Sequence, residues 1–321
     1  MGSEARPARR GVRTARRLLY ALAGAFCLGV AGLALLPSGQ REDRRWQPTL
    51  AAPHHVGSHP SVCFDEGHYN AHRATGRYRP LARLLEADGY RIERHRGRFG
   101  AASLRRCDLV VIANAAGGDR FRLGPINLPI KRGGERGDPA FSAAEIDVLR
   151  RWVEGGGSLL LVADHAPFGG AARALGAAFG VEIGGGFVEV SPAGPAAAGM
   201  GAALFTAANG LLRPHPITAG LKAVKSFTGQ SLAGAGTPLL VLPPDAVEYV
   251  PPGPRLKPVR AGGRAQAVAL AHGRGRVVVL GEAAMITAQL DDSGKPFGMN
   301  LPGIDNQAFA LNLFHWLSRA P

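Results

Sequence analysis

Seven short runs of mainly apolar residues recur along the chain, and segments with the apolar spacing of helices lie between several of them. Strands that are apolar at successive positions are buried on both faces, which is typical of a parallel sheet covered by helices. The sequence therefore predicts an α/β fold with a mostly parallel sheet. The predicted strands are 61–64, 90–93, 109–113, 159–163, 239–242, 267–271 and 277–280, and the predicted helices are 78–87, 143–153, 171–179 and 306–317.

Local signals refine this outline. Gly273 to Gly275 joins the last two strands too tightly for a crossover and predicts a hairpin. Ser142 and Glu145 form a capping-box pattern, and Asp305 is the expected N-cap of the last helix. The segments 117–141, 184–235 and 291–305 are too long for simple connections, so we expect lids or binding loops there.

The N-terminus has the pattern of a membrane-targeting segment. Residues 18–36 are nineteen uncharged residues that follow six arginines. A helix of this length spans about 30 Å, the thickness of a hydrocarbon core. We predict a cytoplasmic basic tail at 1–17, a transmembrane signal anchor at 18–36, a linker at 37–60 and an extracytoplasmic domain at 61–318. A cleaved signal peptide, which would release a secreted or periplasmic protein, is the alternative.

The formal net charge is +14, and part of it comes from the arginines that precede the apolar segment. The remaining arginines are scattered and form no basic stripe interleaved with aromatic residues, so we expect no nucleic-acid binding. Anionic lipid headgroups or cell-wall polymers are better partners for a basic exported domain.

Cys63 and Cys107 fall beside two predicted strands. An exported domain permits a disulfide. We nevertheless favour two buried free thiols, because nothing in the sequence fixes their separation.

Polar side chains gather where the predicted strands end. In an open α/β sheet, ligands bind outside the carboxyl ends of the strands. We therefore predict one crevice built from residues that follow four different strands: Asp65, Glu66, His68 and Asn70; Asn114; Asp164 and His165; and Glu282.

We assign each of these residues a candidate role. Glu66 or Asp164 would be a general base, and His68 with His165 would orient a substrate. The ligand-binding candidates are Asp65, Asn70, Asn114 and Glu282. Carboxylates and imidazoles are also compatible with a divalent metal. The structural alternatives are that Asp65 or Asp164 caps a helix, that the histidines bond to loops and that Glu282 pairs with an arginine.

Several segments resemble a known family: VCFDEGHYN, FSAAEIDVLRRWVEGGGSLLLVADHAPFG, HPIT, VVVLGEAAMITAQ and NQAFALNLFHWLS. Together they resemble an uncharacterised bacterial domain family of the class I glutamine amidotransferase-like superfamily. The resemblance implies a flavodoxin-like three-layer sandwich. It does not imply amidotransferase activity, because Ala163, Asp164 and His165 follow the strand at the place where amidotransferases have their catalytic cysteine.

The leading hypothesis is a membrane-anchored extracytoplasmic domain that binds a small polar or saccharide ligand in the crevice, with hydrolysis of that ligand as an extension. The alternative is a non-catalytic module that binds a partner protein or a cell-wall polymer through its arginine-rich loops.

Overall fold

The computed structural model describes residues 39–117, 120–123, 126–129, 137–190, 202–251 and 257–319. The chain separates into two units, Met1–Gln40 and Arg41–Pro321, and the second holds nearly all of the described residues. The apolar segment 18–36, predicted to cross the membrane, lies outside them. Within the described ranges, no helix combines the length and the apolar character that a bilayer crossing needs.

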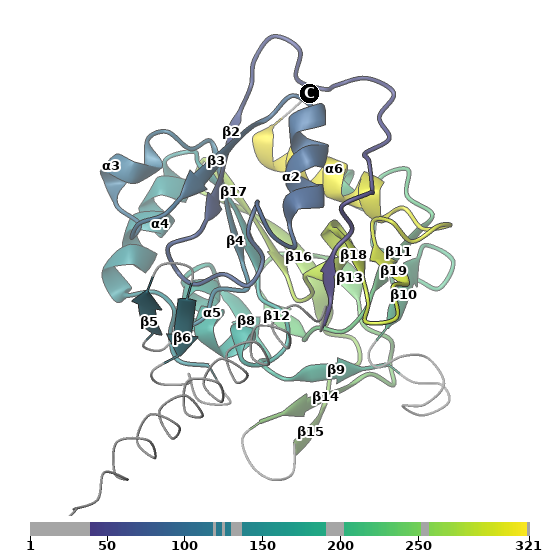
Figure 1. Ribbon diagram of the computed structural model, residues 1–321. Helices are drawn as coiled ribbons and strands as arrows, with labels where there is room; N and C mark the ends of the chain where they lie inside the picture. Colours follow the sequence, from purple (N-terminus) through teal and green to yellow (C-terminus); the bar gives the residue numbers. More distant parts are fainter. Residues whose placement is uncertain are drawn as a thin grey trace, which may run out of the picture. The chain divides into compact units, whose positions relative to one another are not determined.

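A nine-stranded mixed sheet forms the centre of the second unit (Figure 1). Five strands run parallel in the order β3-β2-β4-β7-β17, the flavodoxin-like order 2-1-3-4-5. Four more strands pair antiparallel beyond β17, so the sheet is less parallel than the sequence predicts. The parallel strands are β2 (Ser61–Asp65), β3 (Arg91–His95), β4 (Leu109–Ala113), β7 (Ser158–Val162) and β17 (Gly275–Leu280), and the antiparallel strands are β8 (Val181–Ile183), β12 (Leu232–Gly234), β13 (Thr237–Val241) and β16 (Ala265–His272).

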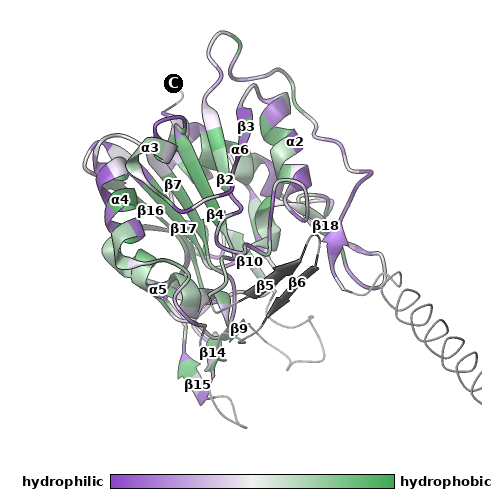
Figure 2. Ribbon diagram, turned by 60° about the vertical axis from the view of Figure 1, so that its left-hand side comes forward, coloured by the Kyte–Doolittle hydropathy of each residue, from purple (hydrophilic) through white to green (hydrophobic). Residues whose placement is uncertain are grey.

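Helices cover both faces of this sheet, which gives three layers (Figure 2). Strands β2, β4 and β7 are buried at every position, as their apolar sequences require. Helices α2 (Arg79–Ala87) and α6 (Asn306–Ser318) pack into one core. Helices α3 (Ala101–Leu104), α4 (Ala143–Glu154) and α5 (Phe168–Ala178) pack into the other.

The predicted local signals are largely confirmed. The hairpin between β16 and β17 forms, with His272 opposite Gly275. The capping box of α4 is present, since Ser142 accepts a hydrogen bond from the backbone N–H of Glu145. Asp305 is the N-cap of α6, but its carboxylate accepts from the backbone N–H groups of Lys222 and Ala223 instead of from the helix.

The three long segments contain further structure. Short strands within these segments, together with strands from elsewhere in the sequence that pair with them, form four small sheets. These are β1 (Arg41–Glu42), β18 (Ala288–Leu290) and β19 (Pro296–Gly298); β10 (Ala203–Thr206) and β11 (Ala223–Ser226); β9 (Phe187–Glu189), β14 (Val247–Val250) and β15 (Lys257–Arg260); and β5 (Arg120–Leu123) and β6 (Ile126–Pro129). Two 3₁₀ turns, η1 (Pro216–Thr218) and η2 (Ala284–Ile286), complete the elements.

The prediction of a linker at 37–60 is corrected for its described part. Strand β1 pairs with β18, and the carboxylate of Asp88 accepts from the backbone N–H of His54. The His54 ring stacks on His315 of α6, with 4.2 Å between ring centroids. The segment 41–60 is therefore a strap bound to the domain.

The preference for free thiols is also wrong. Cys63 in β2 and Cys107, two residues before β4, form a disulfide with Cα atoms 5.7 Å apart. Parallel pairing of β2 with β4 brings these positions together, and the sequence alone could not show that register.

Candidate functional site

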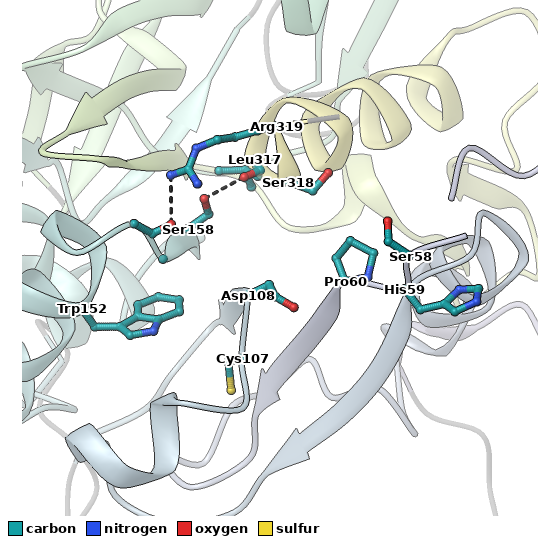
Figure 3. Close-up of a pocket in the computed structure, with 12 residues that line it drawn as sticks. Ser58, His59, Pro60, Cys107, Asp108, Trp152, Ser158, Leu317, Ser318 and Arg319 are labelled. Carbon is teal, nitrogen blue, oxygen red and sulfur yellow. Dashed lines mark hydrogen bonds between the residues drawn. The ribbon is translucent and has the colours of Figure 1, made fainter. Parts of the chain in front are cut away.

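Two pockets lie at opposite edges of the central sheet. The larger, about 440 Å³, is at the amino ends of the parallel strands, where Pro60, Asp108 and Ser158 line it (Figure 3). The smaller, about 310 Å³, is at the carboxyl ends, where His68, Arg98 and Ser142 line it. We call them the amino-edge pocket and the carboxyl-edge pocket. The carboxyl-edge pocket lies where β2 and β4 end, which is the switch point at which flavodoxin-like sheets bind ligands.

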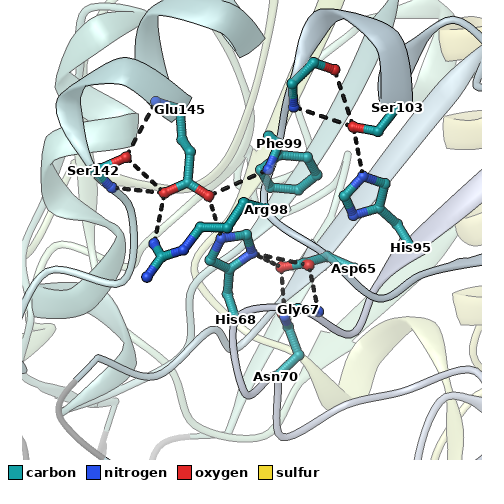
Figure 4. A network of polar contacts seen from close by, with 11 residues as sticks. Asp65, Gly67, His68, Asn70, His95, Arg98, Phe99, Ser103, Ser142 and Glu145 are labelled. Atoms are coloured by element: carbon teal, nitrogen blue, oxygen red, sulfur yellow. Dashed lines mark hydrogen bonds and ion pairs between the residues drawn. The ribbon is translucent and has the colours of Figure 1, made fainter.

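A buried histidine held between two carboxylates lies behind the carboxyl-edge pocket (Figure 4). Nδ1 of His68 is 2.9 Å from Oδ2 of Asp65, and Nε2 of His68 is 2.8 Å from Oε1 of Glu145. The imidazole lies between the rings of Phe99 and Phe141, with centroid distances of 4.9 and 4.7 Å. Both ring nitrogens are therefore engaged, and both aromatic contacts fix the plane of the ring.

The imidazole of His68 and the carboxylate of Glu145 shift each other's pKa toward the charged forms. Burial lowers the pKa of His68, but hydrogen bonds and charge from Asp65 and Glu145 outweigh it and raise the pKa above the usual value. Burial raises the pKa of Glu145, yet hydrogen bonds from Ser142 and His68 hold it at about 2. Glu145 is therefore held ionised, and its charge and that of Asp65 favour the protonated form of His68. With both nitrogens hydrogen-bonded, His68 is poorly placed to transfer a proton.

Glu145 is a site residue that the sequence predicts only as a helix cap. Besides completing the capping box, its carboxylate accepts from Nη1 of Arg98 at 2.9 Å and from the backbone N–H of Phe99 at 3.2 Å. Arg98 itself keeps 76% of its side chain exposed beside the pocket. The capping-box motif is a local signal, and it contains no information about the loop that packs against the helix.

The two predicted asparagines connect the strand ends. Asn70 donates to Asp65 at 2.6 Å and accepts from the backbone N–H of Ala113 at 2.7 Å. Asn114 adopts a left-handed backbone conformation with φ of 59°, and its Oδ1 accepts from the backbone N–H of Asp164. Both side chains are buried and tie the ends of β2, β4 and β7 together.

A second pair of buried carboxylates lies at the ends of β7 and β17. Asp164 accepts from the backbone N–H groups of His165 and Ala283, and Glu282 accepts from those of Ala284 and Met285. Glu282 therefore pairs with backbone donors instead of an arginine. Burial and the nearby charge of Asp164 raise the pKa of Glu282 to about 8.

Two other predicted site residues have different surroundings. Glu66 forms an ion pair with Arg94 of β3, with Oε2 of Glu66 2.6 Å from Nη2 of Arg94. It is therefore not a free carboxylate that could act as a general base. His165 is half-buried, with its Nδ1 2.9 Å from the carbonyl oxygen of Ala166 and its ring stacked on Phe187. Neither side chain joins the Asp65–His68–Glu145 network.

Two buried residues outside the predicted site set, His72 and Tyr78, lie near the second pair. Burial, and then the charges of Arg77 and His165, lower the pKa of His72 to about 3, so this ring is neutral. It lies 3.2 Å from Nδ2 of Asn114. The hydroxyl of Tyr78 donates to the carbonyl oxygen of Ala283.

No group of three or more His, Cys, Asp or Glu side chains within the described ranges is arranged to hold a metal ion.

The raised pKa of Glu282 predicts a pH dependence of stability. Because the pKa in the folded chain is about 8 and the ordinary value is 4.5, the folded protein binds an extra proton between these values. This stabilisation is complete below about pH 4.5 and is lost as the pH rises through about 8, by on the order of a few kcal/mol. Glu282→Gln should flatten the decline in the free energy of unfolding between pH 6 and 9, measured by chemical denaturation.

The exposed Asp291→Asn is the matched control for this experiment and should keep the parental slope. If Glu282→Gln keeps the same slope as the parent, Glu282 is already ionised at neutral pH and the pairing with Asp164 does not perturb it.

No protein-family model and no curated protein sequence matches this chain. Among solved structures, it is similar to the mmIFT52 N-terminal domain, with a TM-score of 0.53 and 15% identity over 80% of this chain and 97% of that chain. It is also similar to ThuA-like proteins from Bacteroides uniformis (TM-score 0.43, 13% identity, 84% of this chain and 94% of that chain) and Parabacteroides merdae (0.43, 14%, 81% and 90%). At this identity, the likeness to the mmIFT52 domain is evidence for a shared fold alone.

Proposed function

We propose that this chain is an exported, membrane-anchored member of the class I glutamine amidotransferase-like superfamily that binds a small carboxylate-bearing ligand, such as an acidic sugar, in the carboxyl-edge pocket. The superfamily assignment is supported by the sequence segments quoted above and by the flavodoxin-like strand order. Neither paired cysteine lines this pocket, so the described residues place no amidotransferase thiol there.

The charge lining the pocket is the observation that supports this ligand class. The charged donor that a ligand meets in the lining is the guanidinium of Arg98, whose side chain is 76% exposed, with His68 in the wall beside it. The carboxylates that balance them, Asp65 and Glu145, are buried behind the wall. A ligand therefore meets donors and positive charge first, and arginine binds carboxylates through paired hydrogen bonds.

The size and lining of the pocket fit a single sugar ring. A volume of about 310 Å³ is at the lower end of the range of about 300–1,000 Å³ usual for small-molecule sites. Tyr69 and Phe141 add aromatic surface to the lining. Aromatic rings pack against the apolar face of a pyranose, while its hydroxyls and carboxylate satisfy polar neighbours.

Export of the domain is supported by two independent observations. The apolar segment 18–36 follows six arginines, the charge pattern that retains the N-terminus in the cytoplasm. The Cys63–Cys107 disulfide is a bond that persists in oxidising compartments outside the cytoplasm.

We do not include hydrolysis in this proposal, because the carboxylates predicted for it are inaccessible or paired. Asp164 is 7% exposed, and Glu66 is bound to Arg94. The alternative of polymer binding through an arginine-rich loop concerns residues 118–136, whose side chains lie outside the described residues.

Arg98→Gln should weaken the binding of glucuronate. The substitution removes a guanidinium, and a hydrogen bond between charged groups contributes about 1.5–3 kcal/mol, so the Kd should rise about tenfold or more. The measurement is isothermal titration calorimetry of sodium glucuronate into the full-length chain in detergent. Glucose, which has the ring and lacks the carboxylate, should bind the parent more weakly.

Arg260→Gln is the control, since Arg260 is an exposed arginine on β15 outside the pocket, and it should bind glucuronate as the parent does. Absence of heat from glucuronate with the parent, or an unchanged Kd in Arg98→Gln, would overturn the proposed ligand class.

A further inference from the structure

The amino-edge pocket is a second cavity that the proposed function does not use. It lies at the opposite ends of the parallel strands, with Pro60 before β2, Asp108 before β4 and Ser158 at the start of β7 (Figure 3). The strap contributes Ser58 and His59 to its wall, and the residues around the end of α6 close another side. Elements from both helix layers and the strap thus meet at one opening.

Three arginines without acidic partners gather beside this pocket. Nη2 of Arg319 donates to the carbonyl oxygen of Gly156 at 2.9 Å, and Nη2 of Arg274 donates to that of Gly155 at 2.9 Å. Burial, and then the charge of Arg319, lower the pKa of Arg276, so these two guanidiniums repel each other. Arg276 itself is held by Trp316, whose carbonyl oxygen accepts from Nη1 and whose ring lies 4.9 Å from the guanidinium. Among the described residues, none of the three forms an ion pair with a carboxylate. A bound anion would relieve this repulsion.

An aromatic wall lies next to the arginines. The indole of Trp152 packs directly on Gly157, because a Cβ at that glycine would come within 2.3 Å of the ring. The ring is half-buried and lines the pocket, as Figure 3 shows. Its Nε1–H has no hydrogen-bond partner within the described part of the chain. Trp152 therefore offers a fixed flat surface and one free donor.

The carboxylate of Asp108 can bind a hydroxyl. Asp108 uses Oδ2 to accept from the backbone N–H of Ser61 at 2.8 Å, which leaves Oδ1 as an acceptor. His59 is engaged elsewhere, because its Nδ1 lies 2.7 Å from the carbonyl oxygen of Gly89. A planar apolar wall, a hydroxyl-binding carboxylate and nearby arginines match a sugar ring that carries a phosphate.

We propose that the amino-edge pocket binds a sugar phosphate, with the ring against Trp152, a hydroxyl on Asp108 and the phosphate at Arg319, which lines the pocket, and the neighbouring Arg274. The volume of about 440 Å³ accommodates such a ligand within the usual range of about 300–1,000 Å³. This site is distinct from the carboxyl-edge pocket and does not depend on the function proposed there.

The test is calorimetric titration of the full-length chain in detergent with glucose 6-phosphate, inorganic phosphate and glucose. We expect glucose 6-phosphate to bind, phosphate to bind more weakly and glucose to give no detectable heat. Arg319→Gln should raise the Kd for glucose 6-phosphate about tenfold or more, because it removes a charged phosphate partner. Arg274→Gln provides a second variant, with an exposed side chain, in case Arg319→Gln does not fold.

Two further variants separate the parts of the proposal. Trp152→Leu should weaken binding of glucose 6-phosphate and leave binding of inorganic phosphate unchanged. Arg98→Gln, in the carboxyl-edge pocket, should leave both unchanged, so a failure of the proposed function there does not affect this result. Equal affinities for phosphate and glucose 6-phosphate would overturn the assignment of a sugar. No binding of either anion, or an unchanged Kd in both Arg319→Gln and Arg274→Gln, would overturn the site.

Discussion

Asp65→Ala is expected to lower the free energy of unfolding by about 3–5 kcal/mol, the usual cost of removing one partner from a buried ion pair. Asp65 is 1% exposed and accepts hydrogen bonds from the backbone N–H of Gly67, from Nδ1 of His68 and from Nδ2 of Asn70. Its removal leaves three donors without this partner, and the two on His68 and Asn70 are buried. Guanidinium chloride denaturation of the full-length chain measures the loss.

The neighbouring Glu66→Ala is the matched control for this substitution. Glu66 also loses an ion pair, but its partner Arg94 is 37% exposed and can be solvated by water. The Glu66 side chain is itself only 6% exposed, but the charge left behind is hydrated, so we expect a smaller loss than in Asp65→Ala. Similar losses in the two variants would show that the network around His68 is not the main support of this sheet edge.

Replacement of both Cys63 and Cys107 by Ser is expected to lower the free energy of unfolding by about 2–4 kcal/mol, because the crosslink restricts the unfolded chain. The bond closes a loop with a sequence separation of 44 residues between β2 and the start of β4. The same denaturation experiment measures the effect. Glucuronate binding should persist, because neither cysteine lines the carboxyl-edge pocket.

Cys27→Ser is the control for the double substitution, because Cys27 belongs to the apolar segment 18–36 and not to the disulfide. In protein isolated without reductant, Cys63 and Cys107 should resist alkylation until a reductant is added. Free alkylation of both thiols in the native cellular protein, together with unchanged stability of the double variant, would contradict the disulfide and remove its support for export.

Apolar patterning predicted the parallel strands of the central sheet closely, but it missed two antiparallel strands, β8 and β12, which have only three residues each. Strand β4 has the predicted bounds, and β7 differs by one residue at each end, because continuous apolar sequence is compatible only with burial on both faces. Patterning could not predict that the strap would pack against the domain. The strap has no apolar periodicity around His54, and His54 is held by Asp88 and His315, which are far from it and from each other in sequence.

The candidate site was predicted in part. Asp65, His68, Asn70 and Asn114 do converge at the ends of β2 and β4, as the rule for parallel sheets requires. Glu282 and Asp164 also meet, but as buried acceptors of backbone hydrogen bonds. Glu145 and Arg98 were missed, because a capping-box glutamate and a loop arginine have no sequence signal that distinguishes them from ordinary surface residues.

The sequence by itself determined that this chain forms an α/β sheet with polar residues at its carboxyl edge, since those features follow from local hydrophobic periodicity and from the positions where strands end. Only the tertiary structure decided which polar residues become partners. Whether a carboxylate meets His68, Arg94 or a backbone N–H depends on strand order and on the packing of α4 against the loop after β3. These contacts join residues tens of positions apart, and local sequence patterns contain no information about them.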